Sequence, residues 1–179
     1  KKGDGIPEDE ELLPALLKRH DYRTACIGKW HLGSQPSQQP NAKGFDTFYG
    51  LLAGHRSYFY NPETSDKDGS LQQYQYNGQK LSFDGYFTDE LASKAQQFIA
   101  GSDQPFMLYM SFTAPHSPNE GTKEDLARFE GQPRQKYAAM MYALDRGVGK
   151  IVDELKATGK FDNTIIFFLS DNGGSTTNQ

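Results

Sequence analysis

The feature that most constrains the fold of this chain is a nearly continuous run of apolar residues, PFMLYMSF, at positions 105–112. A strand with apolar side chains at almost every position is typical of a parallel sheet whose two faces are both covered by helices. Segments 22–28 and 164–169 (TIIFFL) also have strand character. We therefore expect three core strands, with 105–112 and 164–169 buried on both faces.

Helical patterns alternate with these strands. Apolar residues recur at helical spacing in 84–100 and 135–158, and a glycine follows each pattern. A further helix is expected over 7–20, with Pro14 shifting its true start toward the C-terminal side. The polar, tyrosine-rich segment 54–79 shows no clear periodicity and is expected to be a functional or poorly ordered loop. The alternation predicts an α/β fold with a mostly parallel sheet flanked by helices.

Composition excludes several classes of protein. The 179 residues suit one domain or a large part of one. The net charge of −4 gives no sign of the basic surface that nucleic-acid binding needs. No apolar run approaches the ~20 residues of a membrane span. The single cysteine, Cys26, excludes an intramolecular disulfide and a cysteine-based zinc cluster.

Reactive polar residues follow each of the three expected strands. Lys29 and His31 follow the first strand, His116 follows the second, and Asp171 and Asn172 follow the third. Ligands of open α/β sheets bind beyond the carboxyl ends of the strands. If the strands are parallel, these five side chains gather at one edge of the sheet and form one site.

Each pair also has a simpler interpretation. Asp171 and Asn172 carry the hard oxygen donors that suit Ca²⁺ or Mg²⁺, but Asp-Asn-Gly-Gly is also a common solvated turn. Lys29 offers a charge to an anion and His31 can transfer a proton near neutral pH, but Lys-x-His alone equally fits a surface lysine and a histidine that holds a loop.

His116 lies in APHSP, where the flanking prolines would fix the direction of its ring, and a histidine that closes a tight turn is the alternative. Taken together, the three clusters place a hard cation and several cationic groups around an oxyanion, with a histidine to protonate a leaving oxygen. This set fits ester cleavage at phosphorus or sulfur.

Four segments resemble, in order, the landmarks of the type I sulfatases of the alkaline-phosphatase-like superfamily: DYRTACIGKWHLG, GFDTFYG, PFMLYMSFTAPHSP and FDNTIIFFLSDNGG. The resemblance covers nearly the whole chain. It implies an incomplete alkaline-phosphatase/sulfatase-like core and a sulfuric ester hydrolase that acts on a sulfated carbohydrate or an aryl ester.

The resemblance also implies roles for the candidate residues. Lys29 and His116 would bind the sulfate group, and His116 would protonate the leaving alcohol. His31 would contact the nucleophile and assist its regeneration. Asp171 and Asn172 would be ligands of Ca²⁺, with Mg²⁺ as the alternative ion.

The polar segment 54–79 is the candidate for substrate recognition. We expect His55 and Arg56 to bind the substrate, and Arg56, Tyr58 and Tyr60 to face a glycan. A surface loop without a binding role is the alternative.

The chain also departs from the family pattern. The family's nucleophile is a formylglycine made from the Cys or Ser of a Cys/Ser-x-Pro-Ser-Arg motif, and this chain lacks that motif. Cys26 lies inside an expected strand and is interpreted as a small core residue. We therefore expect residues 1–179 to be a partial catalytic domain, without the N-terminal nucleophile segment and the C-terminal part, and to be inactive alone.

Further expectations depend on that interpretation. An incomplete sheet exposes apolar edges, so we expect self-association or a complementing segment. By resemblance, the compartment is periplasmic, extracellular or lysosomal. Two other functions stay open: a phosphodiesterase or phosphonate hydrolase of the same superfamily, and a non-catalytic binding module. The sugar, the sulfate position and exo or endo action are not determined by the sequence.

Overall fold

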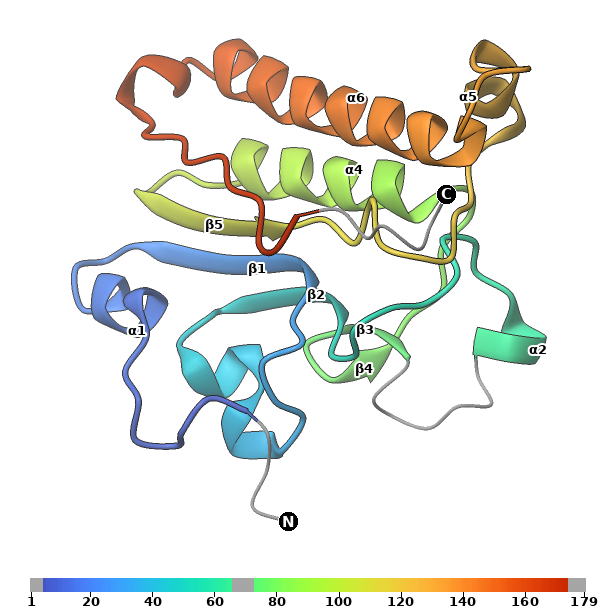
Figure 1. Cartoon of the computed structure of the whole chain (residues 1–179). Coiled ribbons are helices and arrows are strands. Elements are labelled where there is room, and N and C mark those ends of the chain that lie inside the picture. The colour runs from blue at the N-terminus through green and yellow to red at the C-terminus, as the bar shows by residue number, and fades with distance from the viewer. Residues whose placement is uncertain (1–4, 66–72, 174–179) are drawn as a thin grey trace.

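The computed structural model describes residues 5–65 and 73–173 and contains a five-stranded sheet with helices on both faces (Figure 1). The strand order is β4-β3-β2-β1-β5. β1 (Arg23–Lys29) pairs in parallel with β2 (Thr47–Leu51) on one side and β5 (Phe106–Ser111) on the other. β3 (Tyr74–Tyr76) and β4 (Gln79–Lys80) extend the sheet as an antiparallel hairpin. The expected α/β fold with flanking helices is confirmed, and its sheet is mixed: β2, β1 and β5 are parallel, whereas β3 and β4 are antiparallel.

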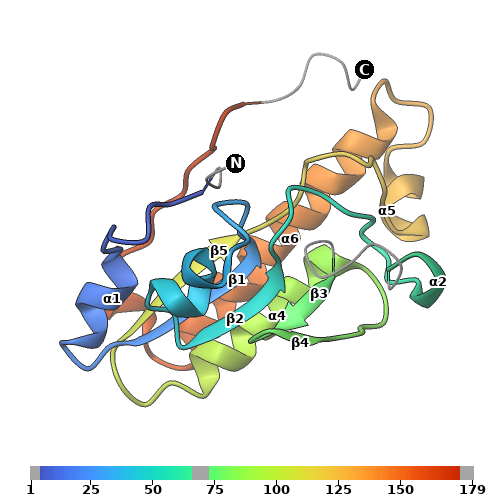
Figure 2. The ribbon, with the colours of Figure 1, turned by 90° about the horizontal axis from the view of Figure 1, so that it is seen from below.

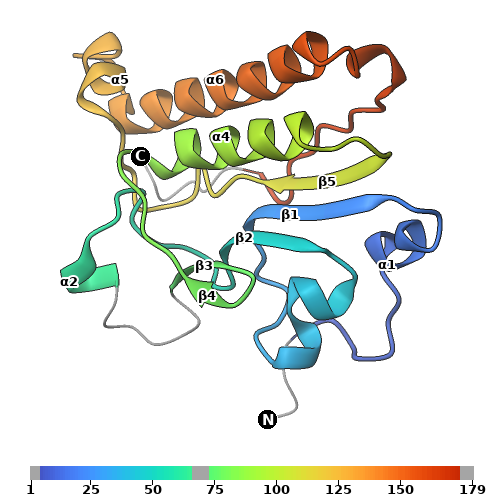
Figure 3. The ribbon, with the colours of Figure 1, turned by 180° about the vertical axis from the view of Figure 1, so that it is seen from behind.

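Two long helices cover one face of the sheet. α4 (Phe87–Ala100) and α6 (Gln135–Ala157) lie side by side, as the views from the front and from behind agree (Figures 1 and 3). Both were predicted, although α4 begins three residues later than the pattern suggested. In the described part of the chain, no helix combines the length and the apolar character that crossing a membrane requires.

Shorter helices complete the layers. The opposite face carries α1 (Leu13–Lys18), which begins late because Pro14 occupies its first turn, as expected. The 3-10 turns η1 (Pro36–Gln38) and η2 (Pro40–Lys43) lie on the same side as α1 (Figure 2). The remaining short helices, α2 (Pro62–Ser65), α5 (Lys123–Arg128) and η3 (Phe161–Asn163), lie in the connections.

The sheet separates two apolar cores because side chains alternate between its faces. Along β1, Ala25 and Ile27 belong to the core beneath α4 and α6, whereas Cys26 belongs to the smaller core on the opposite face. Cys26 is fully buried, and burial raises the pKa of its thiol. Its interpretation as a core residue is confirmed.

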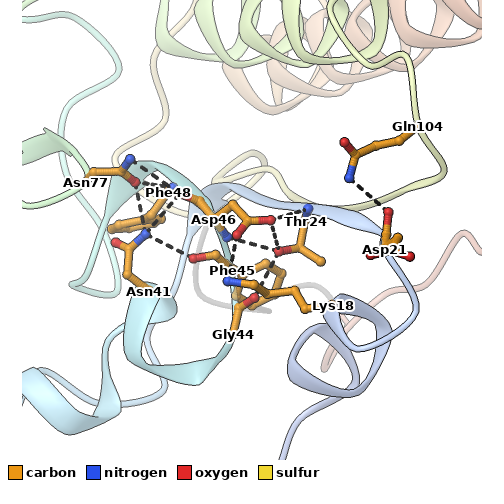
Figure 4. A network of polar contacts seen from close by, with 10 residues as sticks. All are labelled: Lys18, Asp21, Thr24, Asn41, Gly44, Phe45, Asp46, Phe48, Asn77 and Gln104. Carbon is orange, nitrogen blue, oxygen red and sulfur yellow. Dashed lines mark hydrogen bonds and ion pairs between the residues drawn. The ribbon is translucent and has the colours of Figure 1, made fainter.

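A polar network joins the amino ends of β1 and β2 (Figure 4). The Asp46 carboxylate accepts hydrogen bonds from the backbone N–H and the hydroxyl of Thr24, both at 2.9 Å, and pairs with Lys18 of α1 at 2.6 Å. The same Thr24 hydroxyl oxygen lies 2.9 Å from the carbonyl oxygen of Gly44, so that carbonyl and the Asp46 carboxylate share its one proton. These contacts fix the register of the two strands where they begin and attach α1 to them.

An ion network joins the three helices α4, α5 and α6. Arg146 of α6 donates to both carboxylate oxygens of Asp125, at 2.7 and 2.9 Å, and to those of Asp89 at 3.1 and 2.7 Å. Lys150 adds a bond to Asp89 at 3.0 Å. Asp125 is 2% exposed, so its charge depends on Arg146 for compensation.

Two expectations about buried strands need correction. Segment 105–112 forms β5, but β5 is an edge strand of the described sheet and is only half-buried. Segment 164–169 forms no strand, and the side chains of residues 165–169 are 52–85% exposed. The prediction of a buried strand there is wrong for this structure because, among the described residues, no strand pairs with the segment.

Candidate active site

The first site residues follow directly from the end of β1. Pairing with β2 continues past Lys29, since the N–H groups of Trp30 and His31 donate to the carbonyls of Leu51 and Leu52 at 2.9 and 3.0 Å. Trp30 is 3% exposed and its indole N–H donates to the Gln38 carbonyl at 3.0 Å, whereas the His31 side chain is exposed. Trp30 therefore belongs to the core, whereas the His31 side chain does not.

Histidines from three parallel strands meet beyond the carboxyl ends of those strands. The rings of His55, after β2, and His116, after β5, stack with centroids 5.4 Å apart and planes 18° apart. The His31 ring packs against the backbone of Gly54, where a Cβ would lie 2.7 Å from the His31 Cε1 atom. The loops that follow β1, β2 and β5 leave the sheet on the same side, at the right of Figure 1.

Neighbouring positive charges affect the protonation of the His31 ring. Burial lowers the pKa of His31, and the charges of Lys29, His116 and His55 lower it further. A bound anion would act in the opposite direction because it favours the charged imidazolium. Lys29, His55 and His116 therefore lie close enough to His31 for their charges to disfavour its protonated form.

The local contacts of His116 fix which ring nitrogen is available. Nδ1 lies 2.8 Å from the carbonyl oxygen of Ser117. A carbonyl only accepts hydrogen bonds, so Nδ1 carries a proton and Nε2 is the nitrogen left for a ligand. The backbone N–H of His116 donates to Thr113 O at 2.9 Å, which holds the turn that carries the ring.

The three residues that were expected to face a glycan differ in burial and in their contacts. Arg56 is half-buried, and its guanidinium lies 5.5 Å from the centroid of the Tyr74 ring. Tyr60 is partly buried and packs against the core rings of Tyr74 and Phe83. The expectation for Tyr58 is wrong, because Tyr58 is fully buried and its hydroxyl donates to the His116 carbonyl at 2.9 Å.

Asp171 and Asn172 lie elsewhere on the described surface. Both are exposed, and the Asn172 N–H donates to Asp171 Oδ1 at 2.8 Å. Burial raises the pKa of Tyr109 in β5, and the charges of Cys26 and Asp171 raise it further, which places Asp171 near that strand. The structure therefore brings Lys29, His31, His55 and His116 together, and their interactions within residues 5–65 and 73–173 do not include Asp171 or Asn172.

Within 5–65 and 73–173, no group of three or more His, Cys, Asp or Glu side chains is arranged to hold a metal ion. Asp171 and Asn172 by themselves have suitable chemistry. The Asn172 side-chain NH₂ group donates to Asp171 Oδ1 at 2.6 Å and lies 3.2 Å from Oδ2, so the two side chains satisfy each other by hydrogen bonding.

The sulfatase family model matches residues 1–179 of this chain. The chain belongs to the sulfatase family. Its resemblance to that family, deduced above from four segments, is therefore confirmed.

Sulfatase relatives match this chain along most of its length. The uncharacterized sulfatase YdeN of Escherichia coli K12 is 35% identical over 95% of this chain and 34% of its own length. Human N-acetylgalactosamine-6-sulfatase is 31% identical over 96% of this chain and 34% of its own length. This sulfatase chain thus spans about a third of the curated relatives that it matches.

One solved structure has a fold similar to that of this chain. The crystal structure of Ps i-CgsB in complex with k-i-k-neocarrahexaose matches with a TM-score of 0.82 and 36% identity, over 89% of this chain and 39% of that one. The arrangement of the sheet and its helices is therefore the one that this neighbour has.

Three features of this region were not recognised from the sequence. Ser34-Gln35-Pro36-Ser37 matches the first four positions of the nucleophile motif, but Gln38 stands where the motif has Arg, and its side chain is buried. Gly54 beneath the His31 ring and Glu120 behind the His116 loop carried no signal, because both depend on contacts between segments far apart in the chain.

Proposed function

We propose that this chain supplies the anion-binding side of the active site of a sulfuric ester hydrolase. The proposal rests on the meeting of Lys29, His31, His55 and His116 beyond the carboxyl ends of β1, β2 and β5. A lysine and protonated imidazoles suit a sulfate ester because they surround its oxygens with positive charge and N–H donors.

Within this site the side chains have separate tasks. Lys29 binds the sulfate group as a permanent charge, and His31 contacts the nucleophile and assists its regeneration. His116 contacts the sulfate through Nε2, since Nδ1 is held by Ser117 O. When protonated, His116 delivers the Nε2 proton to the leaving oxygen as the sulfur–oxygen bond breaks, a role that contributes ~10²–10⁴-fold to such reactions.

The nucleophile is proposed to lie outside these residues. The chain lacks a Cys/Ser-x-Pro-Ser-Arg motif, and its one cysteine, Cys26, is fully buried. A formylglycine from another segment would supply the attacking oxygen. Residues 1–179 alone therefore should not hydrolyse sulfate esters, and arylsulfatase activity in a preparation of only these residues would contradict this.

A calcium ion is proposed for the second half of the site, with magnesium as the alternative. Asp171 and Asn172 would supply two oxygen ligands, and a bound cation would stabilise negative charge on the sulfate oxygens. Two ligands on an exposed turn make a weak site, so residues 1–179 should bind Ca²⁺ weakly or not at all. Tight binding in calorimetry would contradict the expectation that Asp171 and Asn172 supply only part of the ligand set.

The substrate is proposed to be a sulfated carbohydrate, with an aryl sulfate as the alternative. His55 lies in the site, and Arg56 is its neighbour on the same loop. The neighbouring structure of Ps i-CgsB was solved with neocarrahexaose, which supports a carbohydrate ligand. By family resemblance, the proposed compartment is periplasmic, extracellular or lysosomal.

Self-association, or pairing with a complementing segment, is proposed through the exposed residues 165–169. Their apolar side chains lie open to solvent, and β5 is an edge strand of the described sheet. A sedimentation experiment that shows only monomer across the micromolar range would contradict this proposal.

The central experiment compares anions on the isolated chain. Inorganic sulfate should shift the ring resonances of His31, His55 and His116 in a saturable way, while His20, which lies outside the site, should not respond. His116→Ala should weaken sulfate binding without unfolding the chain. Absence of a saturable shift, or clear preference for inorganic phosphate, would overturn the sulfatase assignment and favour a binding module or a phosphoester hydrolase.

A further inference from the structure

The loops that carry His55 and His116 are tied together at a single carboxylate, that of Glu120. Glu120 Oε2 accepts two hydrogen bonds from the loop after β2: from the Ser57 hydroxyl at 2.9 Å and from the Tyr58 backbone N–H at 2.7 Å. Glu120 itself belongs to the loop after β5, four residues beyond His116. One side chain thus connects two segments that are more than sixty residues apart in sequence.

Tyr58 closes the same connection from the other direction. Its hydroxyl donates to the His116 carbonyl at 2.9 Å, and its side chain is fully buried. The Tyr58 ring stacks on that of Tyr86, with centroids 5.4 Å apart, and the Tyr86 hydroxyl donates to the Glu120 carbonyl at 2.8 Å. The loop from His116 to Glu120 is therefore held at both ends by the buried tyrosine pair.

The exposed rings of His55 and His116 depend on this tie for their spacing. Glu120 holds Ser57 and Tyr58, two and three residues after His55, and the Tyr58 hydroxyl holds the carbonyl of His116. The stacking of two exposed imidazoles is weak, and when both are protonated they repel each other. Rigid loops beneath the rings are therefore needed to keep them 5.4 Å apart.

We infer that Glu120 is a positioning residue that sets the separation of His55 and His116, and with it the width of the anion site. This inference rests on the proposed function, because it assumes that the two rings face a common anion. Glu120 contacts the backbone and side chains of the loops, and it affects the anion only through the positions of the two histidines.

The chemistry of the carboxylate predicts how substitutions differ. Glu120→Gln keeps an oxygen that can accept both hydrogen bonds, although a neutral acceptor binds more weakly than a charged one. Glu120→Ala removes the acceptor, so the Tyr58 N–H and the Ser57 hydroxyl lose the partner that joins the loops. The alanine variant should therefore separate the rings, and the glutamine variant should largely retain their spacing.

The test uses the full 179-residue chain with labelled histidines and inorganic sulfate as the probe. The first readout is the cross-relaxation between the His55 and His116 rings without sulfate. The second is the sulfate Kd. We expect Glu120→Ala to lose the ring-to-ring signal and to weaken sulfate binding about tenfold, and Glu120→Gln to stay within about threefold of wild type. Glu130→Ala, an exposed glutamate, is the matched control and should change neither readout.

The two readouts separate the possible failures. If folded Glu120→Ala keeps both the ring-to-ring signal and the wild-type Kd, the inference is wrong. If the wild-type chain binds no sulfate while Glu120→Ala still loses the ring-to-ring signal, the positioning role stands and the proposed function fails. If Glu120→Ala does not fold, Glu120→Asp is used, because it keeps the charge but withdraws the carboxylate by one methylene from the Ser57 hydroxyl and the Tyr58 N–H, and an unchanged ring-to-ring signal there overturns the inference.

Discussion

Replacing Gly54 with alanine should displace the His31 imidazole and nothing else. The added Cβ would lie 2.7 Å from His31 Cε1, 2.9 Å from Nε2 and 3.1 Å from Nδ1, and ordinary contact begins at 3.4 Å. The nearest atoms all belong to the His31 ring, so the ring is the group that must move, by about 0.7 Å. Because that ring is exposed, it can move without disrupting the core.

The magnitude follows from that displacement. A misplacement near 1 Å in a binding or catalytic group can cost about 10²-fold, so a shift of this size should weaken sulfate binding about tenfold. The free energy of unfolding should change by less than about 1 kcal/mol, since alanine also restricts the unfolded chain. The substitution therefore separates binding from stability.

The assay combines sulfate titration with urea denaturation, and the His31 ring resonance reports the displacement directly. Gly149→Ala is the matched control. Gly149 lies exposed in α6, with nothing within 4 Å of the added Cβ, so this change should leave sulfate binding intact and raise stability by about 0.5–1 kcal/mol. An unmoved His31 resonance together with wild-type affinity in folded Gly54→Ala would refute the reasoning.

Three further predictions concern charge. Arg146→Met should lower the free energy of unfolding in urea by about 3–5 kcal/mol, because it leaves the buried Asp125 carboxylate without its partner. Adding Asp125→Asn should recover part of that loss. Equal stability of Arg146→Met and wild type would contradict this prediction. The pKa of His31 should lie below 6.5 in sulfate-free buffer and rise when sulfate binds, so sulfate should bind more tightly as pH falls. Without sulfate, the folded chain should lose stability as pH falls below about 6.5, because the unfolded chain binds the proton more readily. A histidine NMR titration that gives a pKa of 6.5 or higher without sulfate argues against the site. Burial raises the pKa of Asp46, but hydrogen bonds from Lys18 and Thr24 outweigh this effect and hold the pKa below its ordinary value. Asp46→Asn should therefore lower Tm above pH 4, and the difference in Tm from wild type should shrink as pH falls below about 4. A pH-independent difference in Tm would mean that the charge of Asp46 is not involved.

The parts of the fold that could be predicted are those fixed by local patterns. Helical spacing located α4 and α6, and apolar runs located β1 and β5. β2 was not predicted as a strand, because TFYGL has glycine among its aromatic residues and shows its strand character only when paired with β1. The hairpin β3–β4 lay within a segment interpreted as an irregular loop.

The site was predictable in part for the same reason. Lys29, His31 and His116 follow recognisable strands, so the parallel order of β1 and β5 was enough to bring them together. Tyr58 was misassigned because composition cannot distinguish a tyrosine that faces a glycan from one that is buried with its hydroxyl bonded to a distant carbonyl. The expected burial of TIIFFL requires a neighbouring strand, which local sequence does not specify, and the segment is exposed in the structure.

The Thr24–Asp46 network and the histidine cluster lie at opposite ends of the same short strands. From Thr24 to Lys29 the extended chain runs about 17 Å. Engineering can therefore treat the two ends independently: the loops around His55 and Arg56 can be diversified to select new anionic substrates, while the amino ends of β1 and β2 retain the contacts that hold the scaffold. A library built in this way should lose few members to misfolding.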